Sequence, residues 1–347
     1  MKTRINEIFN IKYPIVLSGM SWISNPELVS AVSNAGGLGI LATGVMKEDE
    51  TRNSIKKTRE LTDKPFGANV PLYVPGAEKN AKILIDEKVP IINYSLGKGD
   101  WICQEVHKYG GKVIATVTNH KHALSAQKDG SDALIITGHE AAAHGGDVTS
   151  LVLIPSIAND LDIPLIAAGG FADGRGLIAA LALGADGIAM GTRFIGTKES
   201  PMHENMKIKT VEKKAYDTIY SDKFDGLPCR VMKDNGSQKY LKKKLFLLNS
   251  ISNSKEIAKD FDIPWIKLAM GVMITGYKKS KKMISMANGY KLFKIGTIDG
   301  NSDKGIIPIG QSTGLINDRP AVSELIEKIM LEANNVKIMI DSKYNEI

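Results

Sequence analysis

Residues 166–192 read Ile-Ala-Ala-Gly-Gly-Phe-Ala-Asp-Gly-Arg-Gly-Leu-Ile-Ala-Ala-Leu-Ala-Leu-Gly-Ala-Asp-Gly-Ile-Ala-Met-Gly-Thr. The order indicates a strand, a glycine turn, a helix of small residues, a second strand and a second glycine turn. Gly169 and Gly170 leave room for backbone N–H groups to close around an anion, and Gly191 with Thr192 repeats this one strand later. In a (β/α)₈ barrel, the loops after strands seven and eight commonly bind a ligand's phosphate. The stretch therefore predicts this barrel and a phosphate site, although the glycines could merely permit tight turns.

The rest of the chain supplies the other strands of such a barrel. Apolar runs without polar alternation are typical of strands that are buried on both faces, and here they alternate with helix-like segments. We therefore predict an α/β fold, a (β/α)₈ TIM barrel with an outer ring of helices. The expected strands are Pro14–Leu17, Leu38–Leu41, Phe66–Val70, Pro90–Tyr94, Lys112–Val117, Ala133–Thr137, Ile163–Ala168 and Gly187–Met190, and the expected helices include Pro26–Ala35, Glu48–Leu61, Ala77–Glu87 and Ser150–Leu161.

The pattern changes after the eighth run. Residues 204–288 lack the short strand spacing and carry a net charge of +9, whereas the whole chain of 347 residues carries +7. We expect a mostly helical, basic insertion that covers the active-site mouth, with residues 1–203 and 289–347 forming the barrel. An amphipathic helix is expected from Pro320 to about Glu332, followed by a polar tail of about a dozen residues. The lysine runs 242–244 and 278–282 fit solvated helix faces or a docking surface for an acidic protein partner.

Composition excludes several classes of protein. With only 6% aromatic residues and no recognised motif, the lysines do not indicate nucleic-acid binding. No run approaches the roughly 18 apolar residues of a membrane span, and the N-terminus shows no signal-peptide pattern, so a cytoplasmic protein is expected. Cys103 and Cys229 are the only cysteines, which argues against a disulfide framework and a cysteine metal site. The sequence leaves the choice between a monomer and a homodimer open.

His144 is the candidate catalytic residue. It follows the sixth expected strand, at the carboxyl end where barrel active sites form, between the small residues Ala143 and Gly145. With an unperturbed pKa of about 6.5, a histidine there could exchange a proton or hydrogen-bond to developing negative charge. The alternative is a histidine that merely caps its loop. His139 and Glu140 lie close in sequence, but no further carboxylate or cysteine cluster supports a metal site, and none is expected.

Several short motifs together resemble one family. Their order and spacing are similar to those of the nitronate monooxygenases, formerly called 2-nitropropane dioxygenases, a family that also contains flavin-dependent NADH:quinone reductases and type II enoyl-acyl-carrier-protein reductases. The similarity covers most of residues 8–203 and 289–332. The motifs are Pro14-Ile15-Val16-Leu17-Ser18-Gly19-Met20, Ser33-Asn34-Ala35-Gly36-Gly37-Leu38-Gly39, Gly67-Ala68-Asn69, Gly138-His139-Glu140-Ala141-Ala142-Ala143-His144-Gly145, the 169–192 block and Gly310–Ile316.

The resemblance implies FMN at the carboxyl end of the barrel, with NADH or NADPH as a candidate electron donor. The flavin would carry the redox chemistry, and the protein would orient the substrate against its N5 atom. His144 matches the family's active-site histidine. The positions that match the cofactor-binding residues are Gly19 and Met20 along the ring, Asn69 at its polar edge, Gly169, Gly170, Gly191 and Thr192 at the phosphate, and Gln311 and Ser312 closing over the ring.

Two departures and several alternative functions remain. The loop reads Ala141-Ala142-Ala143 where many relatives carry a glycine pair, and Thr116 stands where a close relative has lysine. The leading hypothesis is oxidation of alkyl nitronates with O₂. The alternatives are electron transfer from NADH to a quinone, and reduction of an enoyl thioester carried by an acidic protein that docks on the insertion. A flavin-free phosphate-binding barrel without enzymatic activity is a further alternative.

Overall fold

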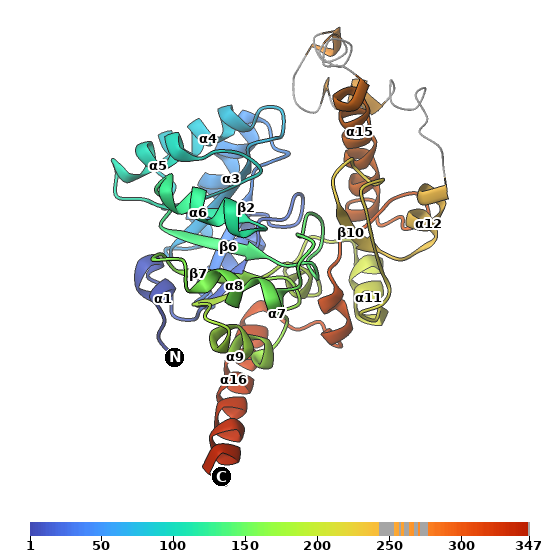
Figure 1. Ribbon diagram of the computed structural model, residues 1–347. Coiled ribbons are helices and arrows are strands. Elements are labelled where there is room, and N and C mark those ends of the chain that lie inside the picture. Colours follow the sequence, from blue (N-terminus) through green and yellow to red (C-terminus); the bar gives the residue numbers. More distant parts are fainter. Residues whose placement is uncertain (243–252, 257, 260–263, 267–269, 271–276, 346–347) are drawn as a thin grey trace.

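Eight parallel strands pair in chain order, and the eighth pairs with the first to close a barrel (Figure 1). The computed structural model describes the chain except residues 243–252, 257, 260–263, 267–269, 271–276 and 346–347. The register at the closure sets Leu17 of the first strand beside Met190 of the last. The predicted fold and all eight predicted strands are confirmed: β1 (Ile15–Leu17), β2 (Leu38–Ala42), β3 (Phe66–Pro71), β4 (Ile91–Ser95), β5 (Lys112–Val117), β6 (Ala133–Thr137), β7 (Leu165–Ala168) and β8 (Gly187–Met190).

Helices alternate with the strands and begin where the sequence provides caps. The side chain of Asn25 accepts a hydrogen bond from the Leu28 amide, and that of Asp173 accepts one from the Gly176 amide, so each satisfies a free N–H in the first turn. A short helix, α1, precedes the barrel. The bounds are α1 (Arg4–Phe9), α2 (Pro26–Asn34), α3 (Glu48–Leu61), α4 (Ala77–Asp86), α5 (Asp100–His107), α6 (His120–Lys128) and α9 (Gly174–Ala182).

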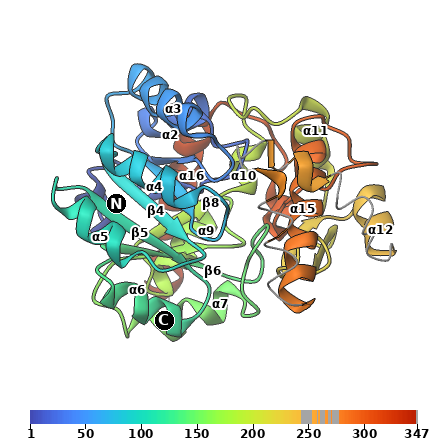
Figure 2. The ribbon, with the colours of Figure 1, turned by 90° about the horizontal axis from the view of Figure 1, so that it is seen from above.

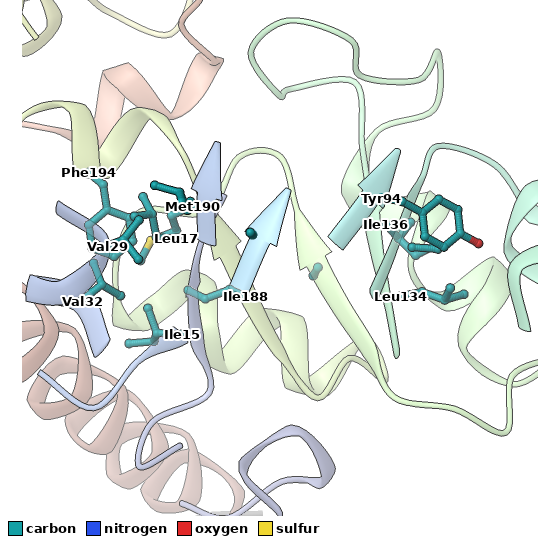
Figure 3. Close-up of a cluster of buried hydrophobic side chains, with 14 of the residues drawn as sticks. Ile15, Leu17, Val29, Val32, Tyr94, Leu134, Ile136, Ile188, Met190 and Phe194 are labelled. Carbon is teal, nitrogen blue, oxygen red and sulfur yellow. The ribbon is translucent and has the colours of Figure 1, made fainter. Parts of the chain in front are cut away.

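The buried side chains form two layers, as the strand pattern requires. One layer fills the barrel and includes Val16, Ile40, Ile114 and Ile166, with Phe9 of α1 among them. The other lies between the strands and the helices, because successive strand residues point to opposite faces. Figure 3 shows part of this outer layer, where Ile15 and Leu17 of β1 and Val29 and Val32 of α2 are drawn with side chains of β4, β6, β8 and α10.

The segment after β6 is not the single helix that the sequence predicted for 150–161. It forms two short helices, α7 (Ser150–Leu153) and α8 (Pro155–Ala158). Pro155 has no N–H to donate into the preceding turn, so the chain restarts there with proline at the first helical position.

The closing helix is longer than expected. Helix α16 (Val322–Asn345) packs against α9 and α2 and then continues away from the barrel to the C-terminus (Figure 1). The prediction that the last dozen residues form a polar tail was therefore wrong, because residues such as Ile338 and Met339 extend the helical periodicity past Asn334 and Asn335. None of the helices in the described ranges is both long enough and apolar enough to cross a membrane.

Between β8 and α16 the chain builds a lobe beside the barrel (Figures 1 and 2). Two antiparallel strands lie within the segment that the sequence predicted to be mostly helical, and the last helix crosses the expected boundary at residues 288 and 289. Of the lysine run 242–244, Lys242 ends a helix, and Lys243 and Lys244 lie outside the described residues. The lobe consists of α11 (Glu204–Glu212), β9 (Thr218–Ser221), β10 (Cys229–Met232), α12 (Asn235–Lys242) and α15 (Tyr277–Thr297).

Candidate active site

The two glycine turns lie side by side, because β7 and β8 are neighbours in the barrel. Gly169 and Gly170 have φ values of +98° and +86°, a conformation that glycine adopts without strain. Gly191 is the residue before the short helix α10 (Thr192–Ile195). Within the described residues, the backbone N–H groups of these two glycines, Gly191 and Thr192 donate to no other part of the chain. Four such donors at the carboxyl ends of two strands fit a phosphate group.

The segment Gly310–Ile316 lies against these turns. The Gly310 amide donates to the Thr192 hydroxyl over 2.9 Å, and the Gln311 amide donates to the Glu140 carbonyl, also over 2.9 Å. A Cβ at Gly310 would lie only 2.8 Å from that carbonyl oxygen, so the close approach requires glycine. Residues 311–315 form a 3₁₀-helix in which Ser312 is buried. The predicted positions 311 and 312 are thus adjacent to the predicted phosphate site.

The loop after β1 meets β3 and β8 at the same end of the barrel. A Cβ at Gly19 would lie 2.5 Å from the Asn69 Cβ, closer than folded chains allow. A Cβ at Gly191 would lie 3.2 Å from the sulfur of Met20. The structure therefore brings together the residues predicted to line a flavin ring and those predicted to hold its phosphate.

A row of polar side chains crosses the barrel below this point. The Asn69 amide donates to Asn93 Oδ1 over 2.7 Å, and the Asn93 amide donates to the Thr116 hydroxyl over 2.9 Å and to the Ile114 carbonyl over 3.0 Å. Because its nitrogen is used, Asn69 keeps its carboxamide oxygen as an acceptor. Sequence reasoning missed Asn93, although an asparagine inside the apolar run of β4 is a signal that could have found it.

His144 lies in the loop after β6, and its side-chain contacts are with the lobe. Its Nε2 lies 3.2 Å from Asp225 Oδ2, and its Nδ1 lies 3.3 Å from the Pro228 carbonyl oxygen. Its side chain is 30% exposed, whereas that of Asp225 is 9% exposed. Both partners come from the loop between β9 and β10, which the sequence analysis did not connect with the site.

Further contacts join the lobe to three loops of the barrel. The ring of Tyr290 on α15 packs edge-on against Trp22 in the loop after β1, with 5.2 Å between centroids. Lys282, also on α15, places its Nζ 5.4 Å from the ring centroid of Tyr73 in the loop after β3. The Tyr220 hydroxyl donates to the Gly145 carbonyl over 2.9 Å, next to His144. The lobe therefore borders the carboxyl end of the barrel on the side of His144.

Comparison with known proteins shows which family has this arrangement. The family model described as nitronate monooxygenase matches residues 2–83 and 73–332. The chain belongs to the nitronate monooxygenase family.

Several known proteins resemble the chain over different lengths. It is 35% identical to the (3aS,4S,5R,7aS)-5-hydroxy-7a-methyl-1-oxo-octahydro-1H-indene-4-carboxyl-CoA dehydrogenase of Rhodococcus jostii, over 96% of both chains. It is 31% identical to a probable nitronate monooxygenase of Staphylococcus saprophyticus, over 66% of this chain and 78% of the relative. The structure of FabK from Thermotoga maritima superposes with a TM-score of 0.82 at 34% identity and covers 100% of both chains.

The loop departure at Ala143 has a structural consequence. Ala143 has φ +52°, in the left-handed region that favours glycine, and its amide and carbonyl pair with the backbone of Arg230 on β10. The Arg230 guanidinium in turn donates to the His139 carbonyl over 2.9 Å. The pairing with β10 holds this strained residue, and with it the position of His144.

The charges and hydrogen bonds around His144 favour the protonated form of its imidazole. Burial lowers the pKa of His144, but the hydrogen bond and charge of Asp225 and the Pro228 carbonyl outweigh burial, so the pKa is raised above 6.5. The charge of Lys282 opposes this without reversing it. The surroundings of His144 therefore favour the imidazolium over the neutral ring.

His144, Asp225 and Cys229 offer ligand atoms that all lie within 4.8 Å of one another in the described part of the chain. Burial raises the pKa of Cys229 well above its ordinary value, which keeps the thiol protonated. His139 and Glu140 are engaged elsewhere, with the Gly146 carbonyl and with Ser150. The sequence did not indicate that a carboxylate and a cysteine lie beside His144, and in this group the two imidazole nitrogens face oxygen atoms of Asp225 and Pro228.

Proposed function

We propose that this protein is an FMN-dependent oxidoreductase that acts on an acyl thioester of coenzyme A. The observation that carries this proposal is the extent of the similarity. The match to the CoA dehydrogenase spans 96% of the chain, which includes the lobe that supplies Asp225 and Lys282, whereas the match to the probable nitronate monooxygenase spans 66%. The lobe borders the candidate site, so a relative that shares it is the better guide to the substrate.

The residues present fit FMN, and each has a defined task. Gly169, Gly170, Gly191 and Thr192 would hold the phosphate through the four free N–H groups, and the Asn69 oxygen would accept a hydrogen bond at the polar edge of the ring. Gly19, Met20, Gln311 and Ser312 would line the ring. Bound there, FMN supplies electron transfer to or from the substrate, with NADH or NADPH as a candidate donor.

The protein's own contribution to the reaction would be positive charge at the place where the substrate becomes negative. Removing a proton from the α carbon of a saturated thioester, or adding hydride to the β carbon of an enoyl thioester, places negative charge on the carbonyl oxygen. A cationic His144, with Lys282 nearby on α15, would stabilise that charge. The net charge of +9 over residues 204–288 also favours a phosphate-bearing substrate such as coenzyme A, or an acidic carrier protein that holds the same thioester.

Anaerobic mixing tests this proposal directly. The purified protein, expected to be yellow, is mixed in turn with a saturated acyl-CoA, with NADH, with NADPH and with an alkyl nitronate, and the flavin absorbance is followed. We expect bleaching by an acyl-CoA, or bleaching by a nicotinamide followed by recovery on addition of an enoyl-CoA. Recovery with a carrier-bound thioester but not with the CoA ester would show that the substrate is carried by an acyl carrier protein and not by coenzyme A. A protein that binds no flavin would support the non-enzymatic phosphate-binding barrel instead.

Nitronate oxidation with O₂ is the second candidate, and one observation favours it. An alkyl nitronate is an anion, and a histidine held in its charged form would bind an anion directly. Bleaching by a nitronate alone, with no response to any thioester or nicotinamide, would select this function. Bleaching by a nicotinamide with recovery on a quinone would select quinone reduction. His144→Ala is expected to slow the productive reaction at least about tenfold, while His120→Ala, a change on the exposed face of α6, is the matched control.

A further inference from the structure

We propose that Asp225 is a positioning residue that keeps His144 doubly protonated, so that His144 acts on the substrate as a fixed positive charge and not as a general base. The sequence left open whether His144 removes a proton or stabilises an anion. The consequence for the reaction rests on the proposed oxidoreductase function, but the protonation state of His144 does not.

The hydrogen-bond pattern carries the inference. A neutral imidazole has one N–H donor and one nitrogen lone pair, whereas an imidazolium has two donors. Both nitrogens of His144 face atoms that only accept, the Asp225 carboxylate at 3.2 Å and the Pro228 carbonyl at 3.3 Å. In the neutral form, a lone pair would face one of these oxygens, either the buried carboxylate of Asp225 or the exposed carbonyl of Pro228. The imidazolium directs an N–H toward both oxygens, whereas the neutral ring directs an N–H toward only one of them.

The loop that carries Asp225 is fixed against the lobe. Phe224 has 0% exposure, and Gly226 has φ +85°. A Cβ at Gly289 on α15 would lie 2.5 Å from the Asp225 Cβ, so the two backbones approach as closely as glycine allows. The other carboxylate oxygen of Asp225 accepts the Leu227 amide over 3.1 Å. Asp225 is therefore held beside His144 by packing and not only by the attraction between them.

The remaining charged and titratable groups around His144 do not replace Asp225. Lys282 is a cation and opposes the charge on His144, and burial keeps Cys229 as a neutral thiol. Next to His144 on the same loop, the Gly145 carbonyl accepts a hydrogen bond from the hydroxyl of Tyr220 on β9. Asp147, also on this loop, lies 3.4 Å from the same hydroxyl. Arg230 is turned toward the His139 carbonyl. Asp225 is thus the one anionic group in direct contact with the imidazole among the described residues.

This arrangement limits what His144 can do. With no lone pair free on either nitrogen, it has no site to accept a proton from a neutral substrate. It can lower the energy of an enolate or nitronate oxygen by charge alone. The proton that leaves or joins the α carbon of a thioester would then have to be exchanged with another group or with water. A nitroalkane would have to arrive already ionised.

Nitrogen NMR of the imidazole measures the protonation state directly. Protein labelled with ¹⁵N in its six histidines is titrated between about pH 5 and pH 9, and His144→Gln identifies the His144 signals. We expect two protonated nitrogens at neutral pH and a pKa above 6.5. Asp225→Asn should lower that pKa by about one unit or more, and Asp222→Asn, an exposed aspartate in the same segment, should leave it unchanged.

Activity supplies a second readout. In the native enzyme kcat/KM should fall as the pH rises through the pKa of His144, and Asp225→Asn should move this fall to lower pH, with partial return in Asp225→Glu. An unshifted profile in an active Asp225→Asn enzyme would overturn the proposal. If Asp225→Asn does not fold, the wild-type spectrum decides alone.

Two NMR results would also overturn the proposal. One is a wild-type His144 with a nitrogen lone pair at pH 6. The other is one equivalent of zinc that occupies Nε2 and is lost in Cys229→Ser. Failure of every thioester and nitronate to react would reject the proposed function but leave the NMR result standing.

Discussion

The rings of Trp22 and Tyr290 meet edge-to-face with 5.2 Å between their centroids, which joins the first loop of the barrel to the last helix of the lobe. Trp22 has φ +63°, a conformation that a non-glycine side chain adopts only where neighbours hold it. The lobe and the barrel therefore depend on each other at this contact, which lies two residues after Met20, one of the predicted cofactor residues.

A double-mutant cycle measures this contact. Trp22→Leu and Tyr290→Leu should each lower the free energy of unfolding, and their coupling energy should be about 0.5–1.5 kcal/mol, the usual range for an aromatic pair. Urea unfolding of the two single variants and the double variant gives the value. Tyr216, which is 78% exposed, supplies the control, because Tyr216→Leu should show no coupling to Trp22→Leu. Strict additivity of Trp22→Leu and Tyr290→Leu would show that the rings do not stabilise the junction.

Gly170 and Gly110 form a matched pair for testing the phosphate cradle. Both have positive φ, +86° and +80°, and neither would create a clash with a Cβ. Alanine at either position should lower the free energy of unfolding by about 1 kcal/mol through backbone strain. Only Gly170→Ala should also weaken FMN binding, because it disturbs N–H groups predicted to hold the phosphate. Fluorescence titration of the apoprotein measures this, and equal FMN affinity in the two variants would contradict the assignment.

Asn93 should matter for both stability and cofactor binding. It is 2% exposed and links Asn69 to Thr116, so Asn93→Ala removes partners from buried polar groups and should destabilise by about 1–3 kcal/mol. It should also weaken FMN binding, because Asn69 loses the contact that orients its oxygen. Asn80→Ala is the control, since Asn80 is 4% exposed and equally well hydrogen-bonded on α4. A similar loss of FMN affinity in both variants would assign the effect to general destabilisation.

The raised pKa of His144 predicts how stability changes with pH. Because its pKa is higher in the folded chain than the ordinary 6.5, its interaction with Asp225 stabilises the fold fully below pH 6.5 and less as the pH rises through the folded value. The difference in free energy of unfolding between wild type and His144→Gln should therefore be largest below pH 6.5 and shrink at alkaline pH. Urea unfolding at several pH values tests this. The exposed pair of His120 and Asp160 serves as the control, with a much smaller change expected for His120→Gln. A difference that grows as the pH rises would contradict the assigned direction.

The barrel could be predicted from the sequence because its information is local. Each strand is a short apolar run, and the turns after β7 and β8 both begin with glycine, so positions 169, 170, 191 and 192 could be predicted as a phosphate site before the fold was known. Gly310 could be placed with them only through the resemblance. The one helix expected over 150–161 divides at Pro155, because proline has no N–H to continue the preceding turn.

The environment of His144 could not be predicted in this way. Asp225 and Pro228 reach the imidazole from a β-hairpin in a segment whose composition suggested helices. No motif near Asp225 in the sequence predicts a contact with residue 144. Such a contact depends on how the lobe folds back on the barrel. Cys229 stayed unassigned for the same reason.

His144 and Asp225 come from two different parts of the chain, the barrel and the lobe. The groups that fit FMN belong to the barrel framework, while the carboxylate that sets the charge of the imidazole belongs to the added segment. Evolution could therefore exchange that hairpin and obtain an enzyme with a different preference for acidic or neutral substrates, without rebuilding the flavin pocket. Related barrels of one ancestry would then diverge in chemistry through a loop that lies outside the barrel strands.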